Sequence, residues 1–317
     1  MVPTRMNHFS LTRAIFLLII CIMSVKTMTG NFILDRHRQK EPSLINDDKF
    51  EFSLTGQKCL IPLAKPMDAH PVLIASYPGS GAKLTWKLIR AITGIMTSDD
   101  YDHNGLAKRK EVIGIKTHYP VPNVSNQQTF SSFAYINRSV LLLRNPIDAL
   151  SSYHNFQYEM SNNLQNHSVR APSEKWIEWR DKYFYEEMKA WVDHTKFWIL
   201  HHAPENRLII SYEHLVSSRD GPSELLKLKN FVRVGNEPIL TTDNVDIPCI
   251  WDTLVNGSID EGTRMASLRK GVTSKGRPLT DNQLKAVKDE LIGLRDLFPD
   301  QLALVLNEYI ERASRSR

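Results

Sequence analysis

One stretch, Val72–Trp86 (VLIASYPGSGAKLTW), constrains the fold more than any other part of the chain. Its apolar run Val72–Ala75 is typical of a buried strand, and a Pro-Gly-Ser-Gly turn leads directly into a helical pattern that begins at Ala82. The two glycines allow backbone angles that other residues resist, and they let a ligand approach the main chain closely. A glycine turn between a strand and a helix presents backbone N–H groups to an anion at the positive end of the helix dipole. We therefore predict an anion-binding loop.

The rest of the body alternates short apolar strands with helices. This alternation predicts an α/β fold, a P-loop-like three-layer domain with a central parallel sheet and helices on both faces. Aromatic residues recur along the segment 173–202, and we interpret that stripe as packing. Irregular segments are expected at Met96–Lys110 and Gly235–Pro278. Further strands are expected at Glu111–Thr117, Val140–Leu143 and Arg207–Ser211, and helices at 82–93, 145–160, 173–202, 222–232, 280–297 and 301–313.

The N-terminus has the pattern of a targeting segment. Arg5 and Arg13 precede the apolar run Ala14–Val25, which Lys26 follows. The run is shorter than the roughly 20 residues that cross a bilayer comfortably. We interpret residues 1–34 as a short signal anchor in the membrane, with a cleaved signal peptide as the alternative. Residues 35–70 would form a stem, and residues 71–317 a single α/β domain.

Glycosylation motifs and cysteines bear on the compartment. Four Asn-x-Ser sequons begin at Asn123, Asn137, Asn166 and Asn256, which favours a glycoprotein with a lumenal chain. We expect a single-pass protein of the secretory pathway, in the Golgi membrane. Cys59 and Cys249 lie in the body of the chain, and their spacing does not show whether they form a disulfide. No Cys or His spacing resembles a metal site.

The charge balance excludes some partners. The net charge is +5, and no block of like charge is long enough to suggest a tail that binds nucleic acid. The modest basicity favours an enzyme that handles anions at a few points.

Polar residues follow four of the expected strands. They are Tyr77–Lys83, Lys116-Thr117-His118, Arg144-Asn145-Pro146 and Tyr212-Glu213. Ligands of open parallel sheets bind beyond the carboxyl ends of the strands, so these residues are expected to meet at one rim.

A metal-dependent P-loop kinase is one interpretation of the loop. Its Walker A motif does not fit Gly81-Ala82-Lys83-Leu84-Thr85, and the strand Val140–Leu143 ends in Arg144 instead of a metal-binding aspartate. A cation at that point repels Mg²⁺ and attracts a second phosphate. The pattern favours a nucleotide with two separated anionic groups and no metal.

These residues resemble the sulfotransferases that use 3′-phosphoadenosine 5′-phosphosulfate (PAPS). Three motifs occur in the order of that family: Tyr77–Gly81 leading to Thr85-Trp86, then Arg144–Asp148 with Ser152, and finally Arg269-Lys270-Gly271. Two shorter matches support them, namely Lys-Thr-His-Tyr-Pro at 116–120 and Tyr-Glu at 212–213. The Pro-Gly-Ser-Gly form is similar to a membrane-anchored or secretory branch of the family.

The resemblance implies where the donor nucleotide binds. Backbone N–H groups of Ser80–Lys83 would hold the 5′-phosphosulfate, and Trp86 would stack on the adenine. Basic side chains would grip the 3′-phosphate, with arginine forming forked, charge-assisted hydrogen bonds. The implied donor-binding residues are Pro78, Gly79, Ser80, Gly81, Ala82, Lys83, Thr85, Trp86, Arg144, Ser152, Tyr212, Arg269, Lys270 and Gly271.

The resemblance also implies the chemistry. His118, whose unperturbed pKa is near 6.5, would accept the proton of an acceptor hydroxyl as that hydroxyl attacks sulfur in line. Lys116 or Lys83 would neutralise the charge that builds on the bridging oxygen of the leaving phosphate. The acceptor is expected to be a carbohydrate, a glycoprotein or a lipid.

The loop departs from the family pattern in two ways. Cytosolic family members carry lysine where this chain has Gly79, and their tryptophan follows the second glycine by three residues instead of five. We therefore expect a loop two residues longer, in which Lys83 either supplies the missing charge or does not. A catalytically inactive nucleotide-binding relative is the main alternative function, and a kinase is the second.

Overall fold

The computed structural model describes residues 59, 68–100, 111–121, 133, 135–164, 169–237, 242–256 and 277–315. Every one of these residues belongs to a compact unit, Leu54–Arg317. The expected signal anchor and most of the expected stem lie outside the described residues, as do Arg269, Lys270 and Gly271. Among the described helices, none combines the length and apolar character needed to cross a membrane.

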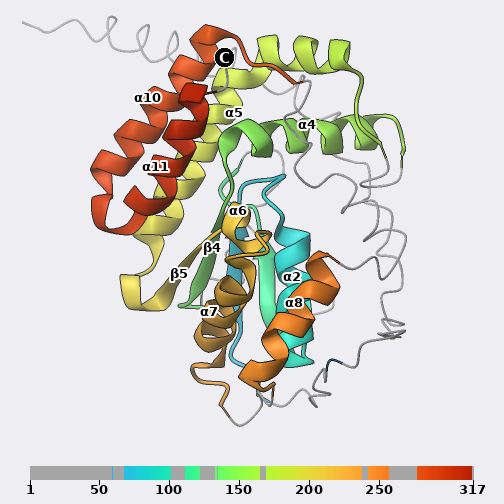
Figure 1. Cartoon of the computed structure of the whole chain (residues 1–317), viewed down its shortest axis with the longest axis vertical. Coiled ribbons are helices and arrows are strands. Elements are labelled where there is room, and N and C mark those ends of the chain that lie inside the picture. The colour runs from blue at the N-terminus through green and yellow to red at the C-terminus, as the bar shows by residue number, and fades with distance from the viewer. Residues whose placement is uncertain are drawn as a thin grey trace, which may run out of the picture. The chain divides into compact units, whose positions relative to one another are not determined.

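A five-stranded parallel sheet with the order β2-β3-β1-β4-β5 forms the centre of the domain (Figure 1). Every residue of β1 and β4 is buried, as expected for strands that are covered on both faces. The predicted α/β class is confirmed. The strands are β1 (Val72–Ser76), β2 (Met96–Asp99), β3 (Val112–Thr117), β4 (Ser139–Leu143) and β5 (Arg207–Ser211).

Helices cover both faces of the sheet. Helices α2, α7 and α8 pack on one another at one face, whereas α5 packs on β4, α4 and α10 (Figure 1). Leu73 and Ala75 share a core cluster with Trp191 of α5, and alternate residues of a strand point to opposite faces. The helices are α2 (Ala82–Thr93), α4 (Pro146–Ser161), α5 (Ser173–His201), α6 (Tyr212–Leu215), α7 (Gly221–Arg233), α8 (Ile247–Val255), α10 (Asp281–Leu297) and α11 (Pro299–Arg315).

Local signals account for the helix ends. Asn145 caps α4 by accepting a hydrogen bond from the Ile147 amide (3.0 Å), and Pro146 occupies the first helical position. Thr280 and Gln283 form a capping box at the start of α10. The aromatic stripe of α5 is core packing, because Trp176, Trp191 and Trp198 are all buried.

Two of the elements that were not predicted lie in segments expected to be irregular. Strand β2 lies where a polar loop was expected, because its sequence, Met-Thr-Ser-Asp, has little strand character and its hydrogen bonds depend on pairing with β3. Helix α8 lies in the segment expected to be irregular. Its apolar residues, such as Ile250 and Leu254, are buried, and the helix contacts α2 and α7.

A disulfide joins Cys59 to Cys249 of α8, with their Cα atoms 5.8 Å apart. The sequence left this pairing open. The bond ties a residue from the expected stem to the helix layer that covers one face of the sheet.

Candidate active site

The order of the strands brings the predicted strand ends together. Strand β1 lies between β3 and β4, and β5 pairs with β4 on its other side. Ala75 is in register with Thr117 of β3 and Leu141 of β4, and Leu143 is in register with Ser211 of β5. The residues that follow these strands therefore emerge at the same edge of the sheet.

The turn after β1 is held in a shape that requires glycine. Gly79 and Gly81 have φ angles of 79° and 95°, in the left-handed region. A Cβ atom on Gly79 would lie 2.5 Å from the carbonyl oxygen of Ala149 in α4, and one on Gly81 would overlap the ring of Tyr212. The loop is thus packed between α4 and the end of β5.

The same turn has features that fit an anion. Helix α2 begins at Ala82, and no side chain caps it with a hydrogen bond. The Ser80 hydroxyl is buried and has no hydrogen-bond partner among the described residues. A buried hydroxyl beside the uncapped start of a helix is a donor that suits a phosphate or phosphosulfate oxygen. Thr85 is less available, because its hydroxyl donates to the Gly81 carbonyl oxygen at 3.4 Å.

The expectation of a longer loop is wrong. The two extra residues lie inside α2, which starts directly after Gly81. Leu84 therefore takes the third position after that glycine, and Trp86 lies about 200° further around the helix. The Lys116 ammonium lies 5.8 Å from the centre of the Trp86 ring. Trp86 thus contacts the β3 side of the site, and its stacking on adenine stays a prediction.

His118 lies at the end of β3 and contacts the end of β1. Its Nδ1 lies 2.7 Å from the Ser76 carbonyl oxygen. Because a carbonyl oxygen can only accept, Nδ1 carries the proton and Nε2 is the unprotonated nitrogen of the neutral ring. Burial and, secondarily, the Lys116 ammonium lower the pKa of His118 to about 3. The ring is therefore neutral and able to accept a proton at physiological pH.

Arg144, Ser152 and Tyr212 meet around the glycine turn. Arg144 Nη1 donates a hydrogen bond to the Gly79 carbonyl oxygen at 2.6 Å, and its guanidinium lies 4.3 Å from the centre of the Tyr212 ring. The Cβ of Ser152 lies 3.2 Å from the point that a Cβ on Gly79 would occupy. Lys83, in contrast, is exposed at the start of α2.

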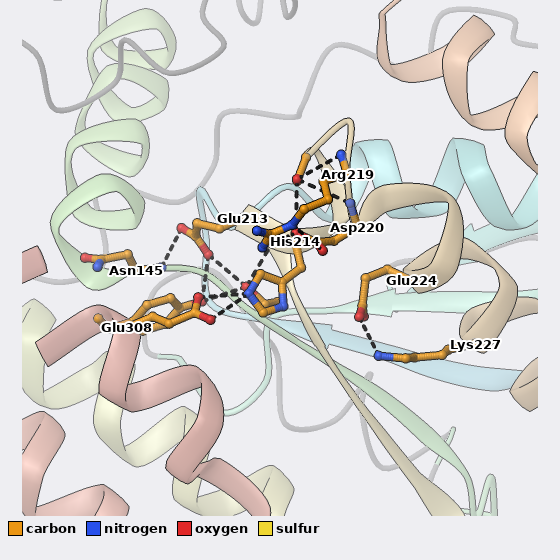
Figure 2. Close-up of polar contacts among 11 residues, drawn as sticks. Asn145, Glu213, His214, Arg219, Asp220, Glu224, Lys227 and Glu308 are labelled. Carbon is orange, nitrogen blue, oxygen red and sulfur yellow. Dashed lines mark hydrogen bonds and ion pairs between the residues drawn. The ribbon is translucent and has the colours of Figure 1, made fainter. Parts of the chain in front are cut away.

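Glu213 connects this group to the C-terminal helices, a role that its residue type alone did not show. Its carboxylate accepts hydrogen bonds from the backbone N–H of Asn145 (3.0 Å) and from the Tyr309 hydroxyl of α11 (2.7 Å). Figure 2 shows the Glu213 carboxylate facing Asn145, with the His214–Glu308 pair beside it. Asn145 lies between Arg144 and the first residue of α4. The hydrogen bond from Asn145 to Glu213 therefore fixes the turn that carries Arg144.

Helix α5 supplies polar residues that sequence reasoning missed. The Tyr77 hydroxyl donates to the Glu187 carboxylate at 2.6 Å. His194 is 1% exposed, and burial and, secondarily, its electrostatic interaction with a protonated His118 lower the pKa of His194 to about 3. The sequence signal that could have identified them is the presence of polar residues, His194 and Glu187, within a helix otherwise marked by buried aromatic residues. The described residues contain no group of three or more His, Cys, Asp or Glu side chains that could hold a metal ion.

Comparisons with known proteins agree with this geometry. Residues 69–239, more than half of the 317-residue chain, match the model of the sulfotransferase domain family. The fold is similar to the crystal structure of mouse sulfotransferase SULT7A1 complexed with PAP, with a TM-score of 0.54, 17% identity, and 78% of this chain and 90% of that chain covered. No curated protein sequence matches the chain closely. The chain therefore belongs to the sulfotransferase domain family.

Proposed function

We propose that this sulfotransferase moves a sulfuryl group from PAPS to the hydroxyl group of an acceptor, with His118 as the general base. Family membership supports sulfuryl transfer, and the mouse sulfotransferase of the same fold is complexed with PAP, the nucleotide that remains when PAPS loses its sulfuryl group. The observation that carries the proposal is the hydrogen bond from His118 to Ser76, because it holds a neutral imidazole directly beside the anion-binding turn.

The donor site follows from the residues around the turn. The amides at the start of α2 and the buried Ser80 hydroxyl would bind the 5′-phosphosulfate. Arg144 and Ser152 would bind the 3′-phosphate, since both lie beside Gly79. Arg269, Lys270 and Gly271, outside the described residues, are proposed to complete that phosphate site.

The proposed reaction is a single displacement. His118 Nε2 takes the proton of the acceptor hydroxyl while its oxygen forms a bond to sulfur. The bond from sulfur to the bridging oxygen breaks, and PAP leaves with the electron pair. General-base assistance of this kind contributes roughly 10²–10⁴-fold to the rate. Binding of the anionic donor beside the ring would raise the low pKa of His118 and so strengthen the base.

Nucleotide titrations test the donor assignment. Calorimetry of the purified full-length protein in detergent should show tight binding of PAP and weak binding of 5′-AMP and Mg-ATP. Equal affinity for all three would contradict the two-phosphate site. Tight PAP binding without any transfer of ³⁵S from labelled PAPS would instead favour an inactive nucleotide-binding protein, an alternative that rests on Gly79 in place of the usual lysine.

A histidine substitution tests the base. His118→Ala should lower kcat by at least about 100-fold and leave the affinity for PAP unchanged. His201→Ala, at an exposed position near the end of α5, is the matched control and should keep full activity. If His118→Ala retains activity, another group accepts the proton.

Lysine substitutions separate the two candidates for charge neutralisation. We propose Lys116, because it lies two residues before His118 and beside Trp86, whereas Lys83 is exposed. Lys116→Met should lower kcat by more than about tenfold, or ~1.4 kcal/mol, and Lys83→Met by less than that. The reverse ranking would assign the role to Lys83.

We further propose a Golgi location for this enzyme, with residues 1–34 as a signal anchor, residues 35–70 as a stem and the catalytic domain in the lumen. The Cys59–Cys249 disulfide supports an oxidising compartment. Among the described sequons, Asn137 and Asn256 are both exposed.

Expression of the full chain in cells should give protease-protected protein whose mass falls after glycosidase treatment, and N-terminal sequencing should find the anchor uncleaved. Full protease sensitivity in intact microsomes would place the domain on the cytoplasmic side.

A further inference from the structure

A pocket of about 350 Å³ opens beside the proposed catalytic base. Its volume is near the lower end of the ~300–1,000 Å³ that is typical of small-molecule sites, which suits one small group better than a long chain. Helix α5 provides most of its wall. The lining includes Pro120, Glu186, Glu187, Lys189, Asp193 and His194.

Three independent observations connect this pocket to the reaction centre. Pro120 follows His118 by two residues and lines the pocket directly. His194 lines the pocket too, and a proton on His118 would lower the pKa of His194, because the two rings lie near each other. Tyr77, the first residue of the anion-binding turn, donates a hydrogen bond from its hydroxyl to the Glu187 carboxylate. A hydroxyl bound in this pocket would therefore lie near both the base and the donor loop.

The lining of the pocket contains two partly or fully buried side chains that can form hydrogen bonds, His194 and Glu187. His194 is 1% exposed, and its Nε2 has no hydrogen-bond partner among the described residues. Glu187 is partly buried, and one of its carboxylate oxygens accepts the bond from Tyr77. An apolar ligand would cover the Glu187 carboxylate without offering it a hydrogen bond, which costs about 1–3 kcal/mol. These groups match a ligand with several hydroxyls.

The charge of the pocket is negative. Glu186, Glu187 and Asp193 contribute three carboxylates, and Lys189 contributes an ammonium group that forms an ion pair with Asp193. A carboxylate, sulfate or phosphate on the acceptor would face Glu186 and Glu187 without a compensating cation from the lining. The pocket therefore disfavours anionic acceptors.

We propose that this pocket is the acceptor site and that it selects an uncharged sugar, with Glu187 accepting a sugar hydroxyl and His194 hydrogen-bonding to the ligand. The inference rests on the proposed sulfuryl transfer and adds the class of acceptor to it. Among the expected acceptors, it favours a neutral glycan and disfavours an anionic glycan or a purely apolar alcohol.

A glycan array with matched members tests the proposal. The full-length protein in detergent is incubated with ³⁵S-labelled PAPS and an array holding neutral oligosaccharides, the same structures with uronic acid or sulfate groups, and sterol or long-chain alcohols. Labelling should be confined to neutral members. Calorimetry with PAP on the same preparation reports the donor site independently.

Variants of α5 test the assigned residues. His194→Ala should raise the KM for the labelled neutral glycan by at least about fivefold, as expected for one lost hydrogen bond, with the affinity for PAP unchanged. Glu187→Gln keeps an acceptor for the Tyr77 hydroxyl and removes one charge. It should improve the rate with anionic members relative to neutral ones by at least about fivefold. His201→Ala, on the same helix outside the pocket lining, serves as the control.

The outcomes separate the two proposals. If PAP does not bind, the proposed donor and function fail. If PAP binds but labelling falls on anionic or apolar members, or on no neutral member, the acceptor inference is overturned while the donor site stands. Unchanged selectivity in Glu187→Gln, with a folded protein, overturns the assignment of this pocket.

Discussion

At the scale of single residues, Gly79 shows how little room the anion-binding turn leaves for a side chain. Gly79→Ala would place a methyl group 2.5 Å from the Ala149 carbonyl oxygen and would require a left-handed backbone. We expect a loss of at least ~2 kcal/mol in the free energy of unfolding and weaker PAP binding. Denaturant titration and calorimetry would measure both.

Gly293 provides the matched control for that substitution. It is exposed in the interior of α10, and a Cβ there would meet nothing within 4 Å. Gly293→Ala should stabilise the protein by up to ~1 kcal/mol through helix propensity. If both alanine variants behaved alike, the packing of the turn would not be the cause.

The low pKa of His118 predicts an unusual pH profile. For a histidine with a pKa of 6.5, the neutral fraction at pH 5 would be about 30-fold lower than at high pH. Because burial lowers the pKa of His118 in the free enzyme to about 3, its protonation should cause no fall in kcat/KM for PAPS between pH 8 and 5. Initial rates in that range, with folding checked by circular dichroism, would test this. An acidic limb with an apparent pKa near 6.5 would contradict it.

At the scale of elements, Glu213 joins the ends of β4 and β5 to α11. Glu213→Ala removes the acceptor of the buried backbone N–H of Asn145, which should lower the free energy of unfolding by about 1–3 kcal/mol. The turn that carries Arg144 would also lose its support, so we expect weaker binding of PAP. Calorimetry and thermal unfolding would report the two effects.

The neighbouring Glu308 tests whether this effect is specific. Its ion pair with His214 joins the same elements, but the two side chains are 52% and 28% exposed. Glu308→Ala should therefore change stability by less than ~1 kcal/mol and leave PAP affinity unaltered. An equal loss in both variants would mean that Glu213 acts only as another surface contact.

At the scale of the whole molecule, the Cys59–Cys249 disulfide closes a loop that contains the entire sheet. Its removal by Cys59→Ser with Cys249→Ser should lower the free energy of unfolding by ~2–5 kcal/mol, because the unfolded chain gains freedom. Thermal unfolding with and without reductant would show the same direction in the unmodified protein. A reductant-insensitive Tm would contradict this role.

Three histidines make the fold sensitive to acid. Burial is the main cause that lowers the pKa of His118 and His194 to about 3 and that of His154 to about 4. Between those pKa values and pH 6.5, these histidines bind more protons in the unfolded chain than in the folded protein. The free energy of unfolding that they contribute above pH 6.5 is therefore lost as the pH falls. Each buried histidine contributes up to ~1.4 kcal/mol per pH unit. Urea unfolding at pH 7.5, 6 and 5 would measure the slope, and His194→Asn should reduce it.

The sequence by itself determined the alternation of strands and helices, the glycine turn and the cap at Asn145, because each depends on residues close together in the chain. It also placed His118, Arg144 and Tyr212 at strand ends, and parallel pairing brings such ends to one edge. Elements that depend on distant partners were not predictable in this way. Strand β2 forms because β3 offers it hydrogen bonds, and α8 forms where α2 and α7 cover its apolar face.

Only the tertiary structure decided which residues meet at the site. It paired Cys59 with Cys249 and placed Trp86 beside Lys116 instead of extending the loop. It also brought Tyr77 to Glu187, 110 residues away in the sequence, and His194 close to His118. Contacts of that range depend on how helix layers pack on a sheet, and no local spacing in the sequence encodes them.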